Sequence, residues 1–378
     1  MSLVALRFPI DRLAGRRYPE EPHPYRNEFQ RDRDRIVHAR AFRRLEDKTQ
    51  VFGEGFSDHF RNRLTHTIEV AQIARTVASA LALDEDFTEA LALAHDIGHP
   101  PFAHAGEEAL NRAMARFGDK FDHNLHALHI VEDFERRYAR FPGLNLTFEV
   151  REGMLKHSRD FERGERPEFD EYLPGLKPPL EAQIIDLADE VAYNTADLDD
   201  GFSAGLFSLD EIAGQISDYG LLLGRVRTHH PGVPDGILFQ ETLRKLIDLL
   251  VSGLIEGAIE AVARSGCRDL GDVRRANRRL VEMLPRPAAA NRELKTFLYE
   301  RVYSIEPLQL ERRRAMEEIC SLFDHYIEHP EQLPESHQRR AAQLAPQRVV
   351  CDYVAGMTDG FFRRTYANIF GLLGPSAI

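Results

Sequence analysis

The sequence predicts an all-α protein, and three observations support this fold class. Apolar residues recur at spacings of three and four along several long segments, which is the pattern of helices that bury one face. Residues that cap or end helices stand at the ends of these segments. No segment of any length alternates apolar and polar residues as a half-buried strand does, and the sequence contains no internal repeat.

The first strong helical pattern covers residues 64–81. Its apolar residues recur at three- and four-residue spacings, at Ile68, Ala71, Ala74, Val77, Ala78 and Leu81. We therefore expect a helix with one buried face, which carries His66 near its amino end.

A second helix is predicted to begin near Asp84 or Asp86, either of which could cap its first turn. A glycine, a histidine and two prolines at residues 98–101 end it, because proline cannot continue a helix. His95 and Asp96 are therefore expected in its last turn.

A polar loop at residues 159–177 precedes a third predicted helix. That helix begins at Pro178 and Pro179, because proline suits the first helical turn. Four polar residues form one stripe along it at positions i, i+3, i+7 and i+11, namely Asp186, Asp189, Tyr193 and Asp197. Spacing alone leaves open whether Asp186 or Asp189 serves a site.

Further helical patterns cover residues 237–254 and 312–327, the first after a break at 229–232. We predict three regions along the chain. They are an N-terminal extension at 1–35, a core at 36–202, and a C-terminal helical region at 203–378 that packs on the core and takes part in assembly.

Composition limits the class of protein. The 378 residues are 43% hydrophobic, which suffices for one large core or two fused cores. Cys267, Cys320 and Cys351 are far apart and lack CxxC spacing, which argues against disulfides and thiolate zinc sites and favours a cytoplasmic location. No signal-peptide pattern or membrane-length apolar run is present, so we expect no membrane association. The net charge of −12 argues against nucleic-acid binding but permits a small polyanionic substrate.

The residues with the clearest chemical meaning are His66, His95, Asp96 and one carboxylate of the third helix. Imidazole and carboxylate together suit a divalent metal ion, and four protein ligands would leave positions for water and a substrate oxygen. Such an ion would lower the pKa of its bound water and orient a phosphoryl oxygen, and hydrolysis of a phosphate ester needs both. Each histidine taken alone is more often structural, and His95 could simply meet the negative end of a helix dipole. The site is favoured because several histidines cluster, at His66, His95, His99, His104, His123 and His126.

These residues resemble the HD-domain superfamily of metal-dependent phosphohydrolases, and most closely its deoxyguanosine triphosphate triphosphohydrolase family. The resemblance rests on His66, on the His95–Asp96 pair, and on the segments 98–104 and 188–193. Three further segments agree, at 44–52, 61–67 and 352–359. The resemblance therefore spans nearly the whole chain and implies an HD-domain helical bundle as the core, with additional C-terminal helices.

The resemblance also implies the metal ligands, which are His66, His95, Asp96 and Asp189. Asp189 is chosen over Asp186 because the family places a tyrosine and an aspartate four and eight residues after the ligand. Only Asp189 has Tyr193 and Asp197 at those offsets. Mg²⁺ or Mn²⁺ is the expected ion, with Co²⁺, Fe²⁺ and Ni²⁺ as alternatives that such ligands also accept.

Other matching residues are implied to act on the substrate. His104 matches a general acid or proton shuttle, assisted by Glu107. Arg63 matches a phosphate-binding arginine, and Gln50 a residue near the deoxyribose 3′-hydroxyl. Tyr193 matches a contact to the sugar or triphosphate, and we place His99, His123 and Asp197 with these substrate contacts. For Arg43, Arg61 and Lys156 a surface ion pair is at least as good an interpretation.

The reaction of this family consumes a deoxynucleoside triphosphate (dNTP). Water attacks the α-phosphorus, and intact tripolyphosphate leaves. A wall at the sugar 2′ position, for which Tyr193 is a candidate, would exclude ribonucleotides. Relatives form dimers that assemble into tetramers or hexamers and are often activated by a dNTP at a second site. We therefore expect a homo-oligomer, although no residue marks an activator site.

Two other hypotheses stay open. An HD-domain phosphodiesterase or nucleotidase shares the metal but needs neither a triphosphate clamp nor a sugar contact from Gln50. A non-catalytic, nucleotide-sensing HD protein would bind nucleotides without turnover, and the complete set of ligands argues against it. The phosphate product distinguishes all three.

Overall fold

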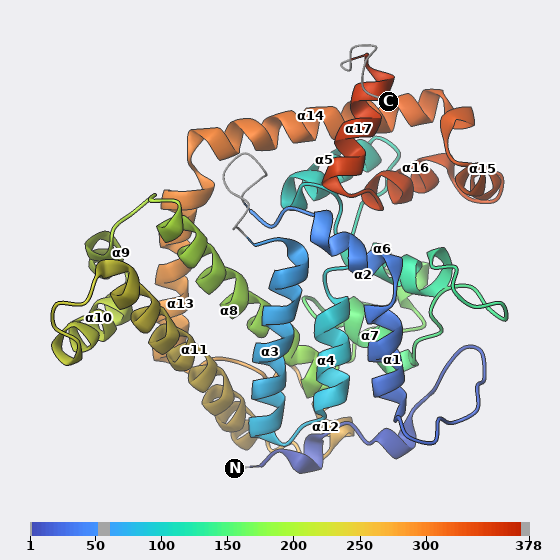
Figure 1. Cartoon of the computed structure of the whole chain (residues 1–378). Coiled ribbons are helices and arrows are strands. Elements are labelled where there is room, and N and C mark those ends of the chain that lie inside the picture. Colours follow the sequence, from blue (N-terminus) through green and yellow to red (C-terminus); the bar gives the residue numbers. More distant parts are fainter. Residues whose placement is uncertain (1, 52–60, 372–378) are drawn as a thin grey trace. The chain divides into compact units, whose positions relative to one another are not determined.

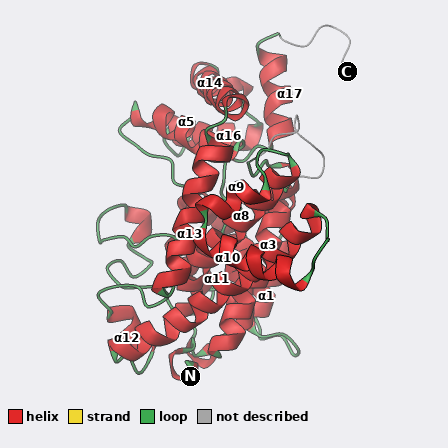
Figure 2. Ribbon diagram, turned by 90° about the vertical axis from the view of Figure 1, so that its left-hand side faces the viewer, coloured by secondary structure: helices red, strands yellow, loops and turns green. Residues whose placement is uncertain are grey.

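The computed structural model describes residues 2–51 and 61–371, and within these ranges the regular elements are helices joined by loops (Figure 2). Three isolated bridges are the only β-type pairings among these residues. The predicted all-α fold class is confirmed. None of the helices in the described ranges combines the length and apolarity needed to cross a membrane. Phe52, the last residue of the 44–52 motif, lies outside the described residues.

The helices are labelled in chain order in Figure 1. The first are α1 (Glu28–Val37), α2 (Arg40–Arg43), α3 (Arg63–Leu81), α4 (Glu85–Ala94), α5 (Ala103–Ala115), α6 (His123–His129), α7 (Phe148–Lys156), α8 (Leu180–Ser203) and α9 (Leu209–Gln215). They continue with α10 (Ser217–His229), α11 (Asp235–Ser265), α12 (Leu270–Arg275), α13 (Pro285–Leu298), α14 (Glu306–Glu328), α15 (Glu335–Ala341), α16 (Pro346–Ala355) and α17 (Asp359–Ile369).

Contacts divide the chain into two compact units that alternate along the sequence. Unit 1 consists of Met1–Ile36, His66–His95 and Leu146–Ile305, and unit 2 of Val37–Thr65, Asp96–Asn145 and Glu306–Ile378. The chain passes from one unit to the other between His95 and Asp96. The boundaries predicted after residues 35 and 202 stay a prediction.

Helix ends in unit 1 follow local chemistry. Asp84 caps α4, because its side chain accepts a hydrogen bond from the amide of Phe87. The helix ends at Ala94 and is shorter than predicted, so His95 is its C-cap and Asp96 lies beyond it. Residues 95–98 form turns instead, the carbonyl of Asp96 accepts from the amide of His99 at 3.1 Å, and Pro100, which has no N–H, follows.

The core of unit 1 unites helices distant in sequence. Helix α4 packs against α7 and α8, and α8 packs against α11 and α13 (Figure 1). The rings of Phe29 and Phe87 stack with their centroids 4.3 Å apart, and Phe8 meets both edge to face. This packing joins the N-terminal segment to α4, the helix whose C-cap is His95.

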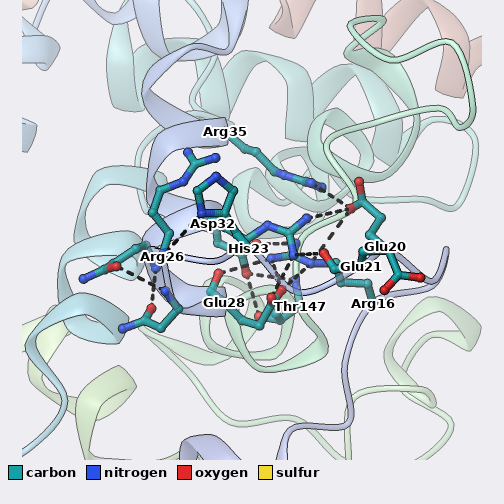
Figure 3. A network of polar contacts seen from close by, with 12 residues as sticks. Arg16, Glu20, Glu21, His23, Arg26, Glu28, Asp32, Arg35 and Thr147 are labelled. Atoms are coloured by element: carbon teal, nitrogen blue, oxygen red, sulfur yellow. Dashed lines mark hydrogen bonds and ion pairs between the residues drawn. The ribbon is translucent and has the colours of Figure 1, made fainter.

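A buried network of charges further fixes the N-terminal segment within unit 1 (Figure 3). Asp32 is fully buried and accepts hydrogen bonds from the amide and the hydroxyl of Thr147, at 2.9 and 2.6 Å. Arg16 pairs with Asp32 and, at 2.7 Å, with Glu28. Removing one partner of a buried pair costs about 3–5 kcal/mol, so the network holds this segment firmly.

The core of unit 2 lies among α5, α14, α16 and α17. Its fully buried side chains include Leu110, Met114, Ile319, Phe323, Val354 and Phe362. Because α5 also carries His104 and Glu107, this core fixes the helix on which both residues lie.

Candidate functional site

Three side chains of unit 1 converge from three helices. His66 lies near the start of α3, His95 is the C-cap of α4, and Asp189 lies within α8. Nε2 of His66 is 2.8 Å from Oδ1 of Asp189, and Nε2 of His95 is 3.8 Å from the same oxygen. Both imidazoles are buried, and their rings meet edge to face with centroids 5.8 Å apart.

The ring of His95 has a defined orientation. Its Nδ1 lies 2.6 Å from the carbonyl oxygen of Ala92, which assigns the proton to Nδ1 and leaves the Nε2 lone pair toward Asp189. His157 packs against this ring edge to face, with centroids 5.9 Å apart. A carbonyl partner on the far nitrogen is the usual support of a metal-binding histidine.

Two imidazole nitrogens face one carboxylate oxygen, an arrangement that a positive charge on the rings or between them would stabilise. Burial alone would raise the pKa of Asp189, but its hydrogen bonds to His66 and His95 hold that pKa well below its usual range. A divalent cation would supply the charge with both rings neutral, and the ring nitrogens of His66 and His95 are close enough to bind one ion. The donor set therefore fits a divalent metal.

Asp186 and Asp189 have different surroundings, although sequence spacing did not separate them. Asp189 contacts both imidazoles, whereas Asp186 is influenced mainly by its own burial and by the charge of Arg279. Burial raises the pKa of Asp186 to about 6. The tertiary contacts of unit 1 thus bring Asp189 to the two histidines.

Tyr193 and Asp197 continue the polar stripe of α8 and meet two residues that the sequence analysis missed. Nζ of Lys295 lies 5.9 Å from the centre of the Tyr193 ring. The hydroxyl of Tyr303 donates a hydrogen bond to the buried carboxylate of Asp197. Lys295 and Tyr303 belong to no recognisable motif and lie about a hundred residues further along the chain, so only their packing against α8 identifies them.

In unit 2, Asp96 is held by Arg63 and His99. Nη1 of Arg63 lies 2.5 Å from Oδ2 of Asp96, and Nδ1 of His99 lies 3.0 Å from Oδ1. All three side chains are buried. Burial and the charge of Arg63 lower the pKa of His99 well below its usual value, so this imidazole is neutral. Arg63, predicted to bind phosphate, thus also pairs with a carboxylate.

A second histidine–carboxylate pair in unit 2 joins His123 and Glu107. Nδ1 of His123 lies 2.9 Å from Oε1 of Glu107, and the ring of His123 packs on that of His99 with centroids 4.1 Å apart. Burial opposes both charges, yet the hydrogen bond and mutual attraction lower the pKa of Glu107 to about 2 and raise the pKa of His123. The two residues therefore form an ion pair.

His104 lies in the first turn of α5, three residues before Glu107. The centre of its ring is 6.3 Å from that of His99. His104 is exposed at its surface, yet desolvation by the surrounding protein and the charge of Arg63 lower its pKa, and the charge of Glu107 opposes this shift. Glu107 thus hydrogen-bonds His123 and acts on His104 through its charge.

Two residues of the 44–52 motif also have distinctive positions in unit 2. Lys48 is buried and donates hydrogen bonds to the carbonyl oxygens of His99 and, at 3.5 Å, of Ala355. Burial lowers the pKa of Lys48 to about 7. Oε1 of Gln50 is buried with no hydrogen-bond partner in the described part of the chain. A buried acceptor of this kind suits a donor on a ligand.

Lys156 and Arg43 both have structural surroundings, but Lys156 is buried and does not form the surface ion pair considered from the sequence. Nζ of Lys156 is buried and donates to Glu152 at 3.0 Å and to the backbone carbonyls of Leu173 and Leu176. Arg43 is exposed and donates to the carbonyl of His38.

Comparisons with known proteins agree with these features. A family model described as HD domain matches residues 63–194, and one described as Phosphohydrolase-associated domain matches residues 281–368. A deoxyguanosinetriphosphate triphosphohydrolase-like protein of Geobacter sulfurreducens is 45% identical, over 95% of this chain and 92% of the relative. Proteins with the same description from Geobacter metallireducens and Thiobacillus denitrificans are each 44% identical, over 94% and 95% of this chain and 92% and 94% of the relatives.

This chain belongs to the deoxyguanosinetriphosphate triphosphohydrolase-like family. The resemblance stated from the sequence is confirmed, and the HD and phosphohydrolase-associated domains assign the protein to the phosphohydrolases. The HD match includes His66, His95, Asp96 and Asp189. The phosphohydrolase-associated match includes Lys295 and Tyr303, which the sequence analysis had not singled out.

Proposed function

We propose that this member of the family is a metal-dependent dNTP triphosphohydrolase. The observation that carries the proposal is the convergence of two buried imidazoles on the carboxylate of Asp189 in a chain of this family. The reaction is attack of water on the α-phosphorus of a dNTP. The bond from phosphorus to the 5′ oxygen breaks, the 5′ oxygen takes up a proton, and the products are a deoxynucleoside and tripolyphosphate.

His66, His95 and Asp189 would hold the metal, and Asp96, the residue that follows His95 in the chain, is the fourth proposed ligand. Mg²⁺ or Mn²⁺ is the proposed ion, with Co²⁺, Fe²⁺ or Ni²⁺ as alternatives. The bound ion would lower the pKa of a water molecule and polarise a phosphoryl oxygen. Neutral rings of His66 and His95 and an ionised Asp189 are the protonation states that this role needs.

His104 is the proposed source of the proton for the 5′ oxygen. Its lowered pKa makes the protonated ring a stronger acid than a free imidazolium, which favours transfer to a developing alkoxide. Glu107, which is held by His123, places its negative charge close to His104. This charge favours reprotonation of the His104 ring after each turnover. The proposal therefore treats Glu107 and His123 as supports of the acid.

Other residues are proposed to bind the nucleotide. Arg63 and Lys295 supply positive charge for the triphosphate. The buried acceptor of Gln50 suits the 3′-hydroxyl, and the ring of Tyr193 suits a wall at the 2′ position. His99 and Asp197 complete the proposed substrate contacts.

The remaining expectations from the family resemblance are carried forward as proposals. We propose that the protein acts in the cytoplasm as a homo-oligomer, either a dimer or an assembly of dimers into tetramers or hexamers. A dNTP bound at a second site is the proposed activator. Nucleic acid is not a proposed partner, because the net charge is −12.

The proposal is tested by incubating the protein with each dNTP, alone and in pairs, with Mg²⁺ or Mn²⁺, and identifying the phosphate product. We expect equal amounts of deoxynucleoside and tripolyphosphate, and no turnover after a chelator has removed the metal. Pyrophosphate or orthophosphate would instead indicate a phosphodiesterase or nucleotidase. Nucleotide binding without any product would indicate a sensing protein. Faster turnover of one dNTP in the presence of another would support the activator.

A further inference from the structure

Asp359, the first residue of α17 in unit 2, uses both oxygens of its carboxylate to hold two distant backbone segments. Its Oδ2 accepts a hydrogen bond from the amide of Thr49 at 2.9 Å, and its Oδ1 accepts one from the amide of Phe102 at 3.0 Å. The residue is buried, with 6% of its surface exposed. One carboxylate therefore fixes two segments that are more than fifty residues apart in the chain.

An acidic residue in the first turn of a helix usually serves that helix. Here α17 already has its own cap, because the side chain of Thr358 accepts from the amide of Phe361. The described hydrogen bonds of Asp359 go to amides outside α17. Stabilisation of the helix dipole therefore does not account for the geometry of this residue.

The amide of Phe102 belongs to a strained turn. Phe102 and Ala103 both have positive φ, at 59° and 54°, a conformation that residues with a Cβ rarely adopt. The side chain of Phe102 is held by the same helix, since its ring meets Phe362 edge to face at 5.2 Å and lies 5.1 Å from the guanidinium of Arg363. Residues of α17 thus contact both the backbone and the ring of Phe102, two residues before His104.

The amide of Thr49 belongs to the segment that ends at Gln50. The same segment is tied to the chain just before α17, because Lys48 donates to the carbonyl of Ala355 and Arg44 to the carbonyl of Gly356, at 3.5 and 2.8 Å. Asp359 is therefore part of a wider attachment of residues 44–49 to the end of α16 and the start of α17.

We propose that Asp359 is a positioning residue that sets the turn carrying His104 and the segment carrying Gln50 at a fixed spacing. The proposal rests on the proposed function, in which His104 donates the proton and Gln50 contacts the 3′-hydroxyl. Asp359 touches neither nucleotide nor metal in this scheme. It acts through the amides of Phe102 and Thr49.

The test compares Asp359→Asn with the unmodified protein on dGTP and on 2′,3′-dideoxy-GTP, which lacks the 3′-hydroxyl. The amide side chain keeps one acceptor oxygen, so one of the two backbone bonds is lost. We expect kcat/KM for dGTP to fall about tenfold, the worth of one hydrogen bond. We expect kcat/KM for the dideoxy nucleotide to fall much less. The ratio of kcat/KM for dGTP to kcat/KM for the dideoxy nucleotide should therefore decrease. Amide hydrogen exchange should become faster at Phe102 or Thr49.

Asp352→Asn is the matched control. Asp352 is equally buried, lies in the same 352–359 motif, and contacts His129 and Arg340, at 3.7 and 3.9 Å. It should lower thermal stability without changing the ratio of the two kcat/KM values. Asp359→Glu, which retains the carboxylate charge but displaces both oxygens, replaces Asp359→Asn if the asparagine variant does not fold.

Two outcomes overturn the proposal alone, given that the unmodified protein releases tripolyphosphate. One is an equal loss on both nucleotides in the Asp359 variant, and the other is an unmodified enzyme that does not distinguish the two nucleotides. If the unmodified protein releases no tripolyphosphate, the proposed function fails and this proposal fails with it.

Discussion

Each unit contains a cluster of histidines and a carboxylate, and the two clusters are satisfied in different ways. In unit 1, His66 and His95 both direct Nε2 toward one oxygen of Asp189. In unit 2, His123 gives its Nδ1 to Glu107, and His99 is bound to Asp96. The first cluster has two rings for one carboxylate oxygen, and the second has one ring for each carboxylate.

This difference shows that the number of potential ligands does not identify a metal site. His99, Glu107 and His123 lie close enough to hold an ion, as do the ring nitrogens of His66 and His95. In unit 2 the acid and the imidazole neutralise each other, because the pKa of Glu107 is about 2 and that of His123 is raised. In unit 1 a divalent cation could bind two neutral rings and one carboxylate together. We therefore expect metal at Asp189 and proton transfer near Glu107.

The largest expected effect comes from Asp189→Asn. Loss of a charged ligand should lower metal affinity and activity by more than the roughly 10–100-fold that loss of a supporting partner costs. Metal content by elemental analysis and tripolyphosphate release check this. Asp186→Asn, one turn earlier on the same helix, is the control and should retain metal and activity. Equal metal loss in both variants would contradict the assignment of Asp189, rather than Asp186, as the metal ligand.

A smaller effect is expected for Glu107→Gln. The amide cannot keep His123 charged or supply negative charge to His104, so kcat should fall about 100-fold, the lower end of what acid–base catalysis contributes. The metal content should not change. Glu108→Gln is the control, because Glu108 is exposed and pairs only with Arg312 among its described contacts, at 2.6 Å. Loss of metal in the Glu107 variant would contradict the assignment of Glu107 to proton transfer.

The smallest expected effect is on stability against pH, measured by urea unfolding with a chelator present. The folded pKa of Glu107 is about 2, below its usual 4.5, so its contribution is present above pH 4.5 and is lost as the pH falls toward 2. The pKa of His123 is raised above 6.5, so its contribution is present below pH 6.5 and is lost as the pH rises through the folded value. Between pH 4.5 and 6.5 the free energy of unfolding of the unmodified protein should therefore be roughly 2–3 kcal/mol larger than that of Glu107→Gln. A difference that stays constant from pH 2 to 8 would contradict the ion pair.

The helices could be predicted because their signals are local. The apolar periodicity of residues 64–81 became α3, and an aspartate cap started α4 at the predicted place. The end of α4 was predicted less well, since the pattern continued to Ile97 whereas the helix stops at Ala94. Residues 95–98 form turns ahead of the two prolines at 100 and 101, and the apolar periodicity does not register this change.

For the candidate site, the sequence by itself determined which residue types were present and which helices carried them. It could not choose between Asp186 and Asp189 from spacing, because both lie on one stripe of α8 and only packing brings a given turn to His66 and His95. It also missed Lys295 and Tyr303 and gave no role to Asp359 of the 352–359 segment, because these residues reach their partners across about a hundred residues or more. Local physics decides where helices begin and end, whereas contacts between distant segments depend on how side chains fill a shared core, and only the tertiary structure decides that.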